Sequence, residues 1–289
     1  MELRVLKYFL AVAKEKNISR AAESLHLTQP TLSRQIAELE SELGKKLFSR
    51  GKQMNLTDEG MILKNRAEEV VALIEKIQQD FNHGGEVTGN ISIGAGVYSS
   101  SSQLIRSLEK FSKLYPKVHY EIYTNSSDYL LKKINQGLLD FALLQEPIDI
   151  SNYEFLRLKT KDTWGLFMRS DSPLAEKNFI TRQDLIGRRL CTARRLNVRR
   201  EIDYWLGDTR DLNIFATMNL IDNIIPLIAD SFVEVITPNG AVENYDARKF
   251  IFKPLSPTLE TSTVLVWKKF LPMFSAAKIF LDFIKSAEL

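Results

Sequence analysis

The sequence predicts an α+β chain of several domains: an N-terminal winged helix-turn-helix, a long linker helix, and a C-terminal α/β domain. Three observations predict it. Helical periodicity runs through the first 83 residues, a regular apolar repeat precedes Gly84-Gly85, and strands alternate with helices after Gly89. We therefore place the domains at residues 1–58, 59–84 and 90–289.

The composition is ordinary for a globular protein, with 44% hydrophobic and 26% charged residues. The single cysteine, Cys191, excludes a disulfide within the chain, which fits the reducing cytoplasm. The histidines lie far apart and have no cysteine cluster near them, so we expect no metal site. Charges at the N-terminus argue against a signal peptide, and Asp222, Asp230 and Glu234 interrupt the longest apolar stretch. We therefore expect no membrane association.

Three helices are predicted before residue 45. The first has an apolar face at helical spacing, made of Leu6, Phe9, Leu10 and Ala13. A second fits residues 19–25, with Ser19 as its N-cap. The third begins at Thr28, which can cap it, and Pro30 is tolerated in its first turn because the missing N–H would have no partner there. Gly44 ends this helix.

The second and third of these helices form the predicted helix-turn-helix. The small residues Ala21 and Ala22 let two helices cross closely. The third helix then presents polar side chains from its first turns: Gln29, Thr31, Ser33, Arg34 and Gln35. Arginine suits guanine, glutamine suits adenine, and serine or threonine suits bases or phosphate. This pattern indicates a recognition helix for the major groove of double-stranded DNA.

A basic segment follows the third helix. It contains Lys45, Lys46, Arg50 and Lys52 with no acidic residue among them. Gly51 suggests a tight turn between short strands at residues 46–48 and 54–56, which together would form a β-wing. With the wing included, the expected DNA contacts are Thr28, Gln29, Pro30, Thr31, Ser33, Arg34, Arg50 and Lys52.

The linker helix is predicted to start after Thr57, a cap residue followed by two acids. Its apolar residues are spaced alternately by four and three positions: Leu63, Ala67, Val70, Ile74, Ile77 and Phe81. This is the seam of a coiled coil, so we expect it to build a dimer. The alternative is an amphipathic helix packed on its own domain.

After Gly89 the sequence predicts a mostly parallel sheet with helices on its faces. The expected strands are 90–95, 118–123, 141–144, 164–168, 234–237 and 262–267, and the expected helices are 99–115, 128–136 and 275–287.

Residues 3–60 resemble the DNA-binding domain of LysR-type transcriptional regulators. The matching stretches include TQPTLSRQI at 28–36, SRAAESL at 19–25 and LTDEG at 56–60. The wing is about one residue shorter than is usual in that family. The resemblance implies a dimerisation helix, a periplasmic-binding-protein-like effector domain, and a homodimer that joins with a second dimer into a homotetramer. It also implies that the effector domain has two subdomains, which we place at residues 90–162 with 268–289 and at residues 163–267. The chain would then be a transcription regulator that binds a small-molecule effector.

The first strand of the effector domain is followed by four serines, residues 99–102, at the start of a helix. Their hydroxyls, the backbone N–H groups and the helix dipole would stabilise an anion, whereas the alternative is that they only cap the helix. The spacing also passes as a loose Gly-x-Gly-x-x-Ser phosphate loop, which is a weak signal. With positions implied by the resemblance, the expected effector contacts are Ser99, Ser100, Ser101, Ser127, Gln145, Thr192, Arg194, Thr217 and Asn219.

Six arginines crowd one stretch without an acid among them: Arg188, Arg189, Arg194, Arg195, Arg199 and Arg200. One or two can face the cleft and pair with a carboxylate, and a solvated face or a subunit contact is the expectation for most. No nucleophile–base set, metal cluster or complete cofactor loop favours an enzyme, and a solute-binding protein would need export. We therefore expect no catalysis and no cofactor, and as partners DNA and a small, anionic effector.

Overall fold

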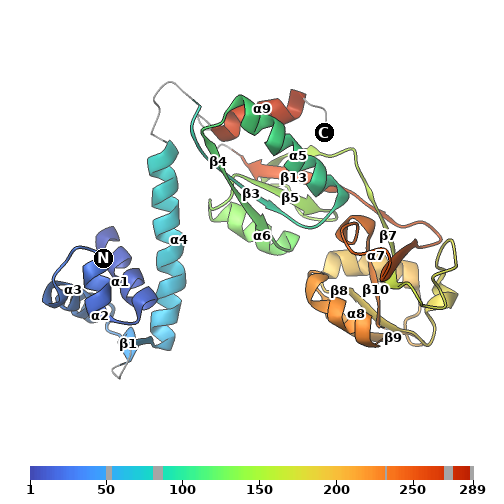
Figure 1. The fold of residues 1–289 in the computed structure, drawn as a ribbon, viewed down its shortest axis with the longest axis horizontal. Coiled ribbons are helices and arrows are strands. Elements are labelled where there is room, and N and C mark those ends of the chain that lie inside the picture. The colour runs from blue at the N-terminus through green and yellow to red at the C-terminus, as the bar shows by residue number, and fades with distance from the viewer. Residues whose placement is uncertain (50–53, 81–86, 232, 270–275, 287–289) are drawn as a thin grey trace. The chain divides into compact units, whose positions relative to one another are not determined.

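The computed structural model describes the chain except residues 50–53, 81–86, 232, 270–275 and 287–289. The chain separates into two compact units, Met1–Asn82 and His83–Leu289 (Figure 1). The linker helix therefore belongs to the same unit as the helix-turn-helix.

The first unit is a small helical domain with a short hairpin. Its elements are α1 (Leu3–Glu15), α2 (Ile18–Ser24), α3 (Gln29–Leu43), β1 (Phe48–Ser49), β2 (Asn55–Leu56) and α4 (Asp58–Asp80). Phe9, Leu32 and Leu47 are fully buried in its core, where α1, α2 and α3 meet. Ala21 and Ala22 are buried at the crossing of the helices, as their small size predicts.

The capping residues of these helices are those predicted from the sequence, with one exception. Thr28 caps α3, with its Oγ1 accepting from the Thr31 N–H at 3.4 Å, and Gly44 ends α3 with a left-handed φ of 64°. The expected cap of α2 at Ser19 is wrong. Asn17 caps this helix instead, because its Oδ1 accepts from the N–H groups of Ser19 and Arg20.

The wing strands are shorter than expected: β1 covers residues 48 and 49 where 46–48 was predicted, and β2 begins one residue later than predicted. β1 pairs with β2 in antiparallel register, Phe48 opposite Leu56. Arg50 and Lys52 lie outside the described residues, so their expected DNA contacts stay predictions. Phe81, the last residue of the expected seam, also lies outside the described residues.

The first subdomain of the second unit is an α/β layer. Its elements are β3 (Gly89–Ala95), α5 (Ser99–Leu114), β4 (Val118–Thr124), α6 (Ser127–Asn135), β5 (Phe141–Gln145), β6 (Tyr153–Arg157), β13 (Thr263–Lys268) and α9 (Ala276–Ser286). The strand order is β4-β3-β5-β13-β6, and β3, β4 and β5 are parallel. Helices α5 and α9 pack on one face through Phe111 and Phe280, and α6 packs on the other through Leu130 and Ile134 (Figure 1).

The second subdomain repeats this architecture. Its strands are β7 (Asp162–Arg169), β8 (Arg189–Ala193), β9 (Asn213–Met218), β10 (Val233–Pro238), β11 (Phe250–Pro254) and β12 (Glu260–Thr261); its helical elements are η1 (Arg182–Leu185), α7 (Leu196–Leu206), η2 (Asp222–Ile224), α8 (Ile225–Ser231) and η3 (Asn239–Ala241). The order is β11-β7-β10-β8-β9, with β12 beside β7. Ile202 of α7 and Ile228 of α8 are buried in separate clusters. Sequence periodicity missed β8, α7 and β9.

The chain passes from the first subdomain to the second and back. The expected return at residue 268 is wrong, because β13 is part of the first sheet. Val264 pairs with Leu144 of β5 and with Arg157 of β6. The second subdomain therefore ends before Thr263. Cys191 is buried in β8.

Candidate functional site

Helix α3 carries an exposed polar face at its N-terminal end. Gln29, Thr31 and Arg34 are exposed, whereas Leu32 and Ile36 are buried on the opposite face. Thr28 and Pro30 are exposed beside them, and Ser33 is half-buried. The structure thus brings the expected contacts within residues 28–34 together on one helix end. The positive end of the helix dipole lies there too, and it favours phosphate.

Arg34 pairs with Glu38 at 3.5 Å, and both side chains are largely exposed. Glu38 also accepts from the Gln35 amide at 2.8 Å. An exposed pair of this kind stabilises the helix by little, roughly 0.3–0.5 kcal/mol. Arg34 can therefore leave Glu38 for a guanine or phosphate at small cost.

Glu40 of α3 binds the start of the wing through hydrogen bonds and an ion pair. Its carboxylate accepts from the backbone N–H groups of Leu47 at 2.8 Å and Phe48 at 3.3 Å, and it pairs with Lys46 at 2.6 Å. Burial by itself would raise the pKa of Glu40, but these hydrogen bonds and the Lys46 charge hold its pKa below the ordinary value. The wing is thus positioned by an ionised group within the unit.

Helix α4 divides its apolar residues between two faces. Ala67 is 1% exposed and lies in the core of the first unit, with Leu63 and Val71 packed beside it. Lys7 of α1 pairs with Glu75 at 3.1 Å on this side. The expectation that Ala67 lies in a seam between two chains is therefore wrong, because α1 already covers it. A second stripe is exposed within the unit: Ile62, Val70, Leu73 and Ile77, and Ile74 is half-buried between the two.

A cleft of about 650 Å³ lies in the second unit, between its two subdomains. The first subdomain contributes Tyr98, the start of α6 and the end of β5, and the second contributes the ends of β8 and β9 and the start of α7. The lining residues are Tyr98, Asn125, Ser126, Ser127, Asp128, Tyr129, Gln145, Ala193, Arg194, Arg195, Asn197, Val198, Met218 and Asn219. Such a site, at the carboxyl ends of strands in both sheets, is where open α/β folds bind ligands.

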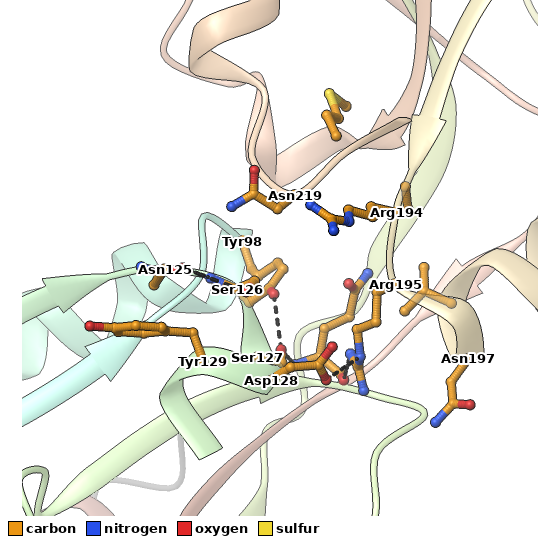
Figure 2. A pocket seen from close by; sticks show the side chains of 14 residues that line it. Tyr98, Asn125, Ser126, Ser127, Asp128, Tyr129, Arg194, Arg195, Asn197 and Asn219 are labelled. Carbon is orange, nitrogen blue, oxygen red and sulfur yellow. Dashed lines mark hydrogen bonds and ion pairs between the residues drawn. The ribbon is translucent and has the colours of Figure 1, made fainter. Parts of the chain in front are cut away.

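Two neighbouring arginines behave differently in this cleft (Figure 2). Arg195 reaches across it: Nη1 donates to the Gln145 carbonyl at 2.7 Å, Nη2 donates to the Pro147 carbonyl at 2.5 Å, and Nε pairs with Asp128 at 3.1 Å. Arg194 points into the cleft, and its guanidinium makes no hydrogen bond or ion pair with any residue that the structure describes. Of these two arginines, Arg195 is therefore already paired within the protein, and Arg194 can pair with a ligand.

The floor of the cleft is polar and buried. The Ser127 hydroxyl accepts from the Gln145 backbone N–H at 3.0 Å and lies 3.4 Å from the Tyr98 hydroxyl. Burial raises the pKa of Tyr98, so its phenol is neutral at physiological pH. These groups can donate and accept hydrogen bonds but bring no charge to the site.

A smaller cavity of about 70 Å³ adjoins the cleft and shares part of its lining. The shared residues are Tyr98, Gln145, Ala193, Met218 and Asn219. The remaining lining is mostly apolar: Val97, Trp164, Leu220, Ile221, Ile236, Thr237, Pro238 and Ala241. The cleft thus has a polar outer part and an apolar inner part.

Four expected effector contacts do line the cleft: Ser127, Gln145, Arg194 and Asn219. Thr192 is fully buried in β8 and Thr217 is exposed on β9, and neither lines the cleft or the inner cavity. Sequence reasoning missed Tyr98, Asn125, Asp128 and Asn197. Only their position near the ends of strands could have identified these residues as part of the cleft.

The serines at the start of α5 do not line the cleft or the inner cavity. Ser99 donates from Oγ to Asp162 at 2.6 Å, and the Ser99 N–H also faces that carboxylate. Ser100 is fully buried and bonded to Thr263, and Ser101 donates to the Gly96 carbonyl. The structure thus gives these serines partners within the chain and lends no support to their expected contact with the effector.

The physical reason is that Asp162 already occupies the anion position at this helix start. It is 1% exposed and also accepts from the Gly240 N–H at 3.1 Å. A Cβ at Gly240 would lie 2.0 Å from the Ser99 nitrogen, so only glycine lets η3 approach α5 this closely. Burial raises the pKa of Asp162, although hydrogen bonds from Ser99 oppose this. The helix dipole is neutralised by the protein's own carboxylate.

The remaining arginines of the basic stretch have structural partners or are exposed. Arg188 pairs with the buried Glu234 at 3.4 Å, and Arg189 stacks over the Phe215 ring at 4.2 Å. Arg199 pairs with Asp203 in α7 at 3.5 Å. Arg200 is exposed on the same helix. The expectation that only one or two face the cleft agrees with the structure.

A helix-turn-helix unit joined to a two-subdomain α/β unit with a polar cleft defines a ligand-responsive DNA-binding regulator. Two family models match: residues 3–61 match "Bacterial regulatory helix-turn-helix protein, lysR family", and residues 84–288 match "LysR substrate binding domain". The chain belongs to the LysR family. It is a DNA-binding transcription regulator with an effector-binding domain, and not an enzyme.

Curated relatives agree with this assignment. The chain is 30% identical over 253 residues to a probable RuBisCO transcriptional regulator of Phaeodactylum tricornutum, covering 84% of this chain and 81% of that one. It is 34% identical over 161 residues to the transcriptional regulator BsdA of Bacillus subtilis, covering 55% of each chain.

Solved structures share the fold. The LysR family regulator CbnR superimposes with a TM-score of 0.76 at 19% identity, covering all of both chains. HinK of Pseudomonas aeruginosa gives 0.56 at 20% identity, covering 99% of each. Among the described residues, no helix is long and apolar enough to cross a membrane, and no group of three acidic, histidine or cysteine side chains is placed to hold a metal ion.

Proposed function

We propose that a small molecule bound in the cleft of residues 83–289 controls this regulator, and that α3 reads the operator. The observation that carries the first part is the cleft itself, with Arg194 pointing into it unpaired and Arg195 bonded across it. A ligand that contacts both subdomains favours one arrangement of them over another. Only such differential binding can change the affinity for DNA.

For the DNA side, we propose that Gln29, Ser33 and Arg34 contact base edges and that Thr28, Pro30 and Thr31 lie against the backbone. Their support is the exposed polar end of α3. The structure of CbnR with its target DNA, at 19% identity and a TM-score of 0.76, concerns a protein of the same fold. Arg50 and Lys52 of the wing remain proposed contacts on sequence grounds.

For assembly, we propose that the exposed stripe of α4 pairs with the same stripe of a second chain. Apolar side chains at helical spacing gain by leaving water, and this unit offers them no cover. Two dimers then join into the tetramer that the sequence resemblance implies.

The test of effector binding uses a cleft-filling variant. Asn219 lines both the cleft and the inner cavity, and the described residues give its side chain no hydrogen bond. Asn219→Trp should bind the operator, found by genome-wide mapping, as wild type does. It should lose the response to every compound that changes wild-type binding, a coupling of about 1–3 kcal/mol in this kind of protein.

The matched control is Asn213→Trp, at the other end of β9 and also exposed. It should respond to those compounds as wild type does. A full response by Asn219→Trp would exclude the cleft as the effector site. A bulky substitution among the serines of α5, such as Ser100→Phe, cannot serve as this test. Ser100 is fully buried, so the substitution would disturb the fold itself.

A further inference from the structure

Two residues that line the inner cavity have side-chain N–H donors without a partner among the described residues. Trp164 is 2% exposed and Gln145 is 7% exposed, and both line this cavity. Trp164 Nε1 and Gln145 Nε2 are buried and have no hydrogen-bond partner among the described residues. A buried N–H without an acceptor is costly. Because both residues line one small cavity, an acceptor that reaches these nitrogens from the cavity would satisfy them.

The acceptor in the inner cavity must be uncharged. The residues that line this cavity carry no formal charge, and most of its lining is apolar. A carboxylate or phosphate placed there would lose its hydration without gaining a counter-charge. A ketone, ether or similar oxygen on an apolar group meets both requirements, because it accepts hydrogen bonds and is cheap to desolvate.

The outer part of the cleft has the opposite character. Arg194 and Arg195 line it, and Asp128 is the one acid among the described residues of its lining. Asp128 is paired with Arg195, so the positive charge of Arg194 is not compensated. Asp162 already neutralises the start of α5. An anionic group in this cleft is therefore stabilised at Arg194.

We propose that the effector is a carboxylate with an apolar head that carries an uncharged hydrogen-bond acceptor. The head lies in the inner cavity against Trp164 and Gln145, and the carboxylate pairs with Arg194. One molecule spans both parts because the cleft and the cavity share Gln145, Met218 and Asn219 in their linings. This inference rests on the proposed function and adds the chemical class of its ligand.

The test titrates the full-length protein by calorimetry with matched probes. Three keto acids (3-acetylbenzoate, 4-acetylbenzoate and 5-oxohexanoate) are compared with their methyl esters and with analogues in which CH₂ replaces the ketone. At least one keto acid should bind saturably. Its ester and its deoxy analogue should each bind at least fivefold more weakly. No saturable binding by any probe, or equal affinity of acid and ester, would overturn the proposal.

Two variants separate the two ends of the ligand. Arg194→Gln should remove the preference for acid over ester and keep the preference for ketone over CH₂. Trp164→Phe should do the reverse. Arg200→Gln and Trp205→Phe are the controls and should keep both preferences, since Arg200 is exposed on α7 and Trp205 donates to the Pro257 carbonyl. If either cleft variant lost both preferences or neither, the assignment of the two ends would be wrong.

A measurement on the unaltered protein covers the case in which Trp164→Phe does not fold. The chain has three tryptophans, so its ¹⁵N spectrum has three indole signals. The keto acid should move the Trp164 signal downfield and its deoxy analogue should not. A different result would contradict the proposed function: if Asn219→Trp keeps the effector response, the cleft is not the effector site. If that response is lost but esters or amines bind best, only the ligand class is wrong.

Discussion

Arg195 donates to the backbone carbonyl of Gln145 at 2.7 Å, so a side chain at the start of α7 is bonded to the last residue of β5. This bond joins the second subdomain to the first. The Arg195 side chain is only 12% exposed. The two subdomains are therefore held together at the edge of the cleft before any ligand arrives.

Replacing this arginine should loosen the second unit. Arg195→Ala leaves two carbonyls without their donor and should cost about 1–3 kcal/mol of unfolding free energy. Arg195→Lys keeps the charge beside Asp128 but not the two-pronged contact, so it should recover only part of the loss. All three tryptophans lie in this unit, so tryptophan fluorescence in urea reports on it. Arg200→Ala is the control, and an Arg195→Ala protein as stable as this control would mean that the contact does not hold the subdomains.

Base reading by α3 should depend on Arg34. Arg34→Ala should lose about 1–3 kcal/mol on the operator and relax the base preference at one position. Affinities for operator and scrambled DNA at a fixed salt concentration measure both effects. Arg4→Ala removes an exposed arginine of α1 and should change neither. Wild-type discrimination by Arg34→Ala would remove α3 from the proposed interface.

Dimer formation should depend on the exposed stripe of α4. Val70→Asp with Ile77→Asp places unpaired charge in the proposed interface and should give monomers in sedimentation velocity. Asn65→Asp with Ala72→Asp adds the same charge at two exposed positions outside the stripe and should keep the parent assembly. If both double variants sediment like wild type, the stripe is not the interface.

The ionised state of Glu40 should be visible in a pH titration. Its pKa is lowered in the folded state, so its contribution to stability is present above the unfolded value, near 4.5, and is lost as pH falls through the folded value. The Leu47 amide signal, whose N–H donates to Glu40, should therefore titrate with a midpoint below 4.5. Glu40→Gln should abolish this titration and Glu23→Gln should not. A midpoint above 4.5 would contradict the assignment.

The helix-turn-helix was predictable because its signals are local. Thr28 and Gly44 bound α3 through contacts within a few residues, and the buried stripe of that helix follows from its period. The cap of α2 was misplaced by two residues because Asn17 and Ser19 are both good caps. The alternating strands and helices of the second unit were also readable, but β8, α7 and β9 were not. The two strands are only five and six residues long, and α7 carries four charged residues within a run of five.

The sequence by itself determined the family, the recognition helix and the presence of two subdomains, since each depends on motifs or periods along the chain. Only the tertiary structure decided which polar groups are free. Asp162 lies 63 residues from Ser99 and takes the helix start that a free anion would otherwise occupy. Likewise α1 covers Ala67 but leaves Val70 and Ile77 exposed. Hydrogen bonding and burial depend on contacts between segments that are distant in the sequence. For this reason only the tertiary structure shows that Arg194 is the arginine of the cleft that can pair with a ligand.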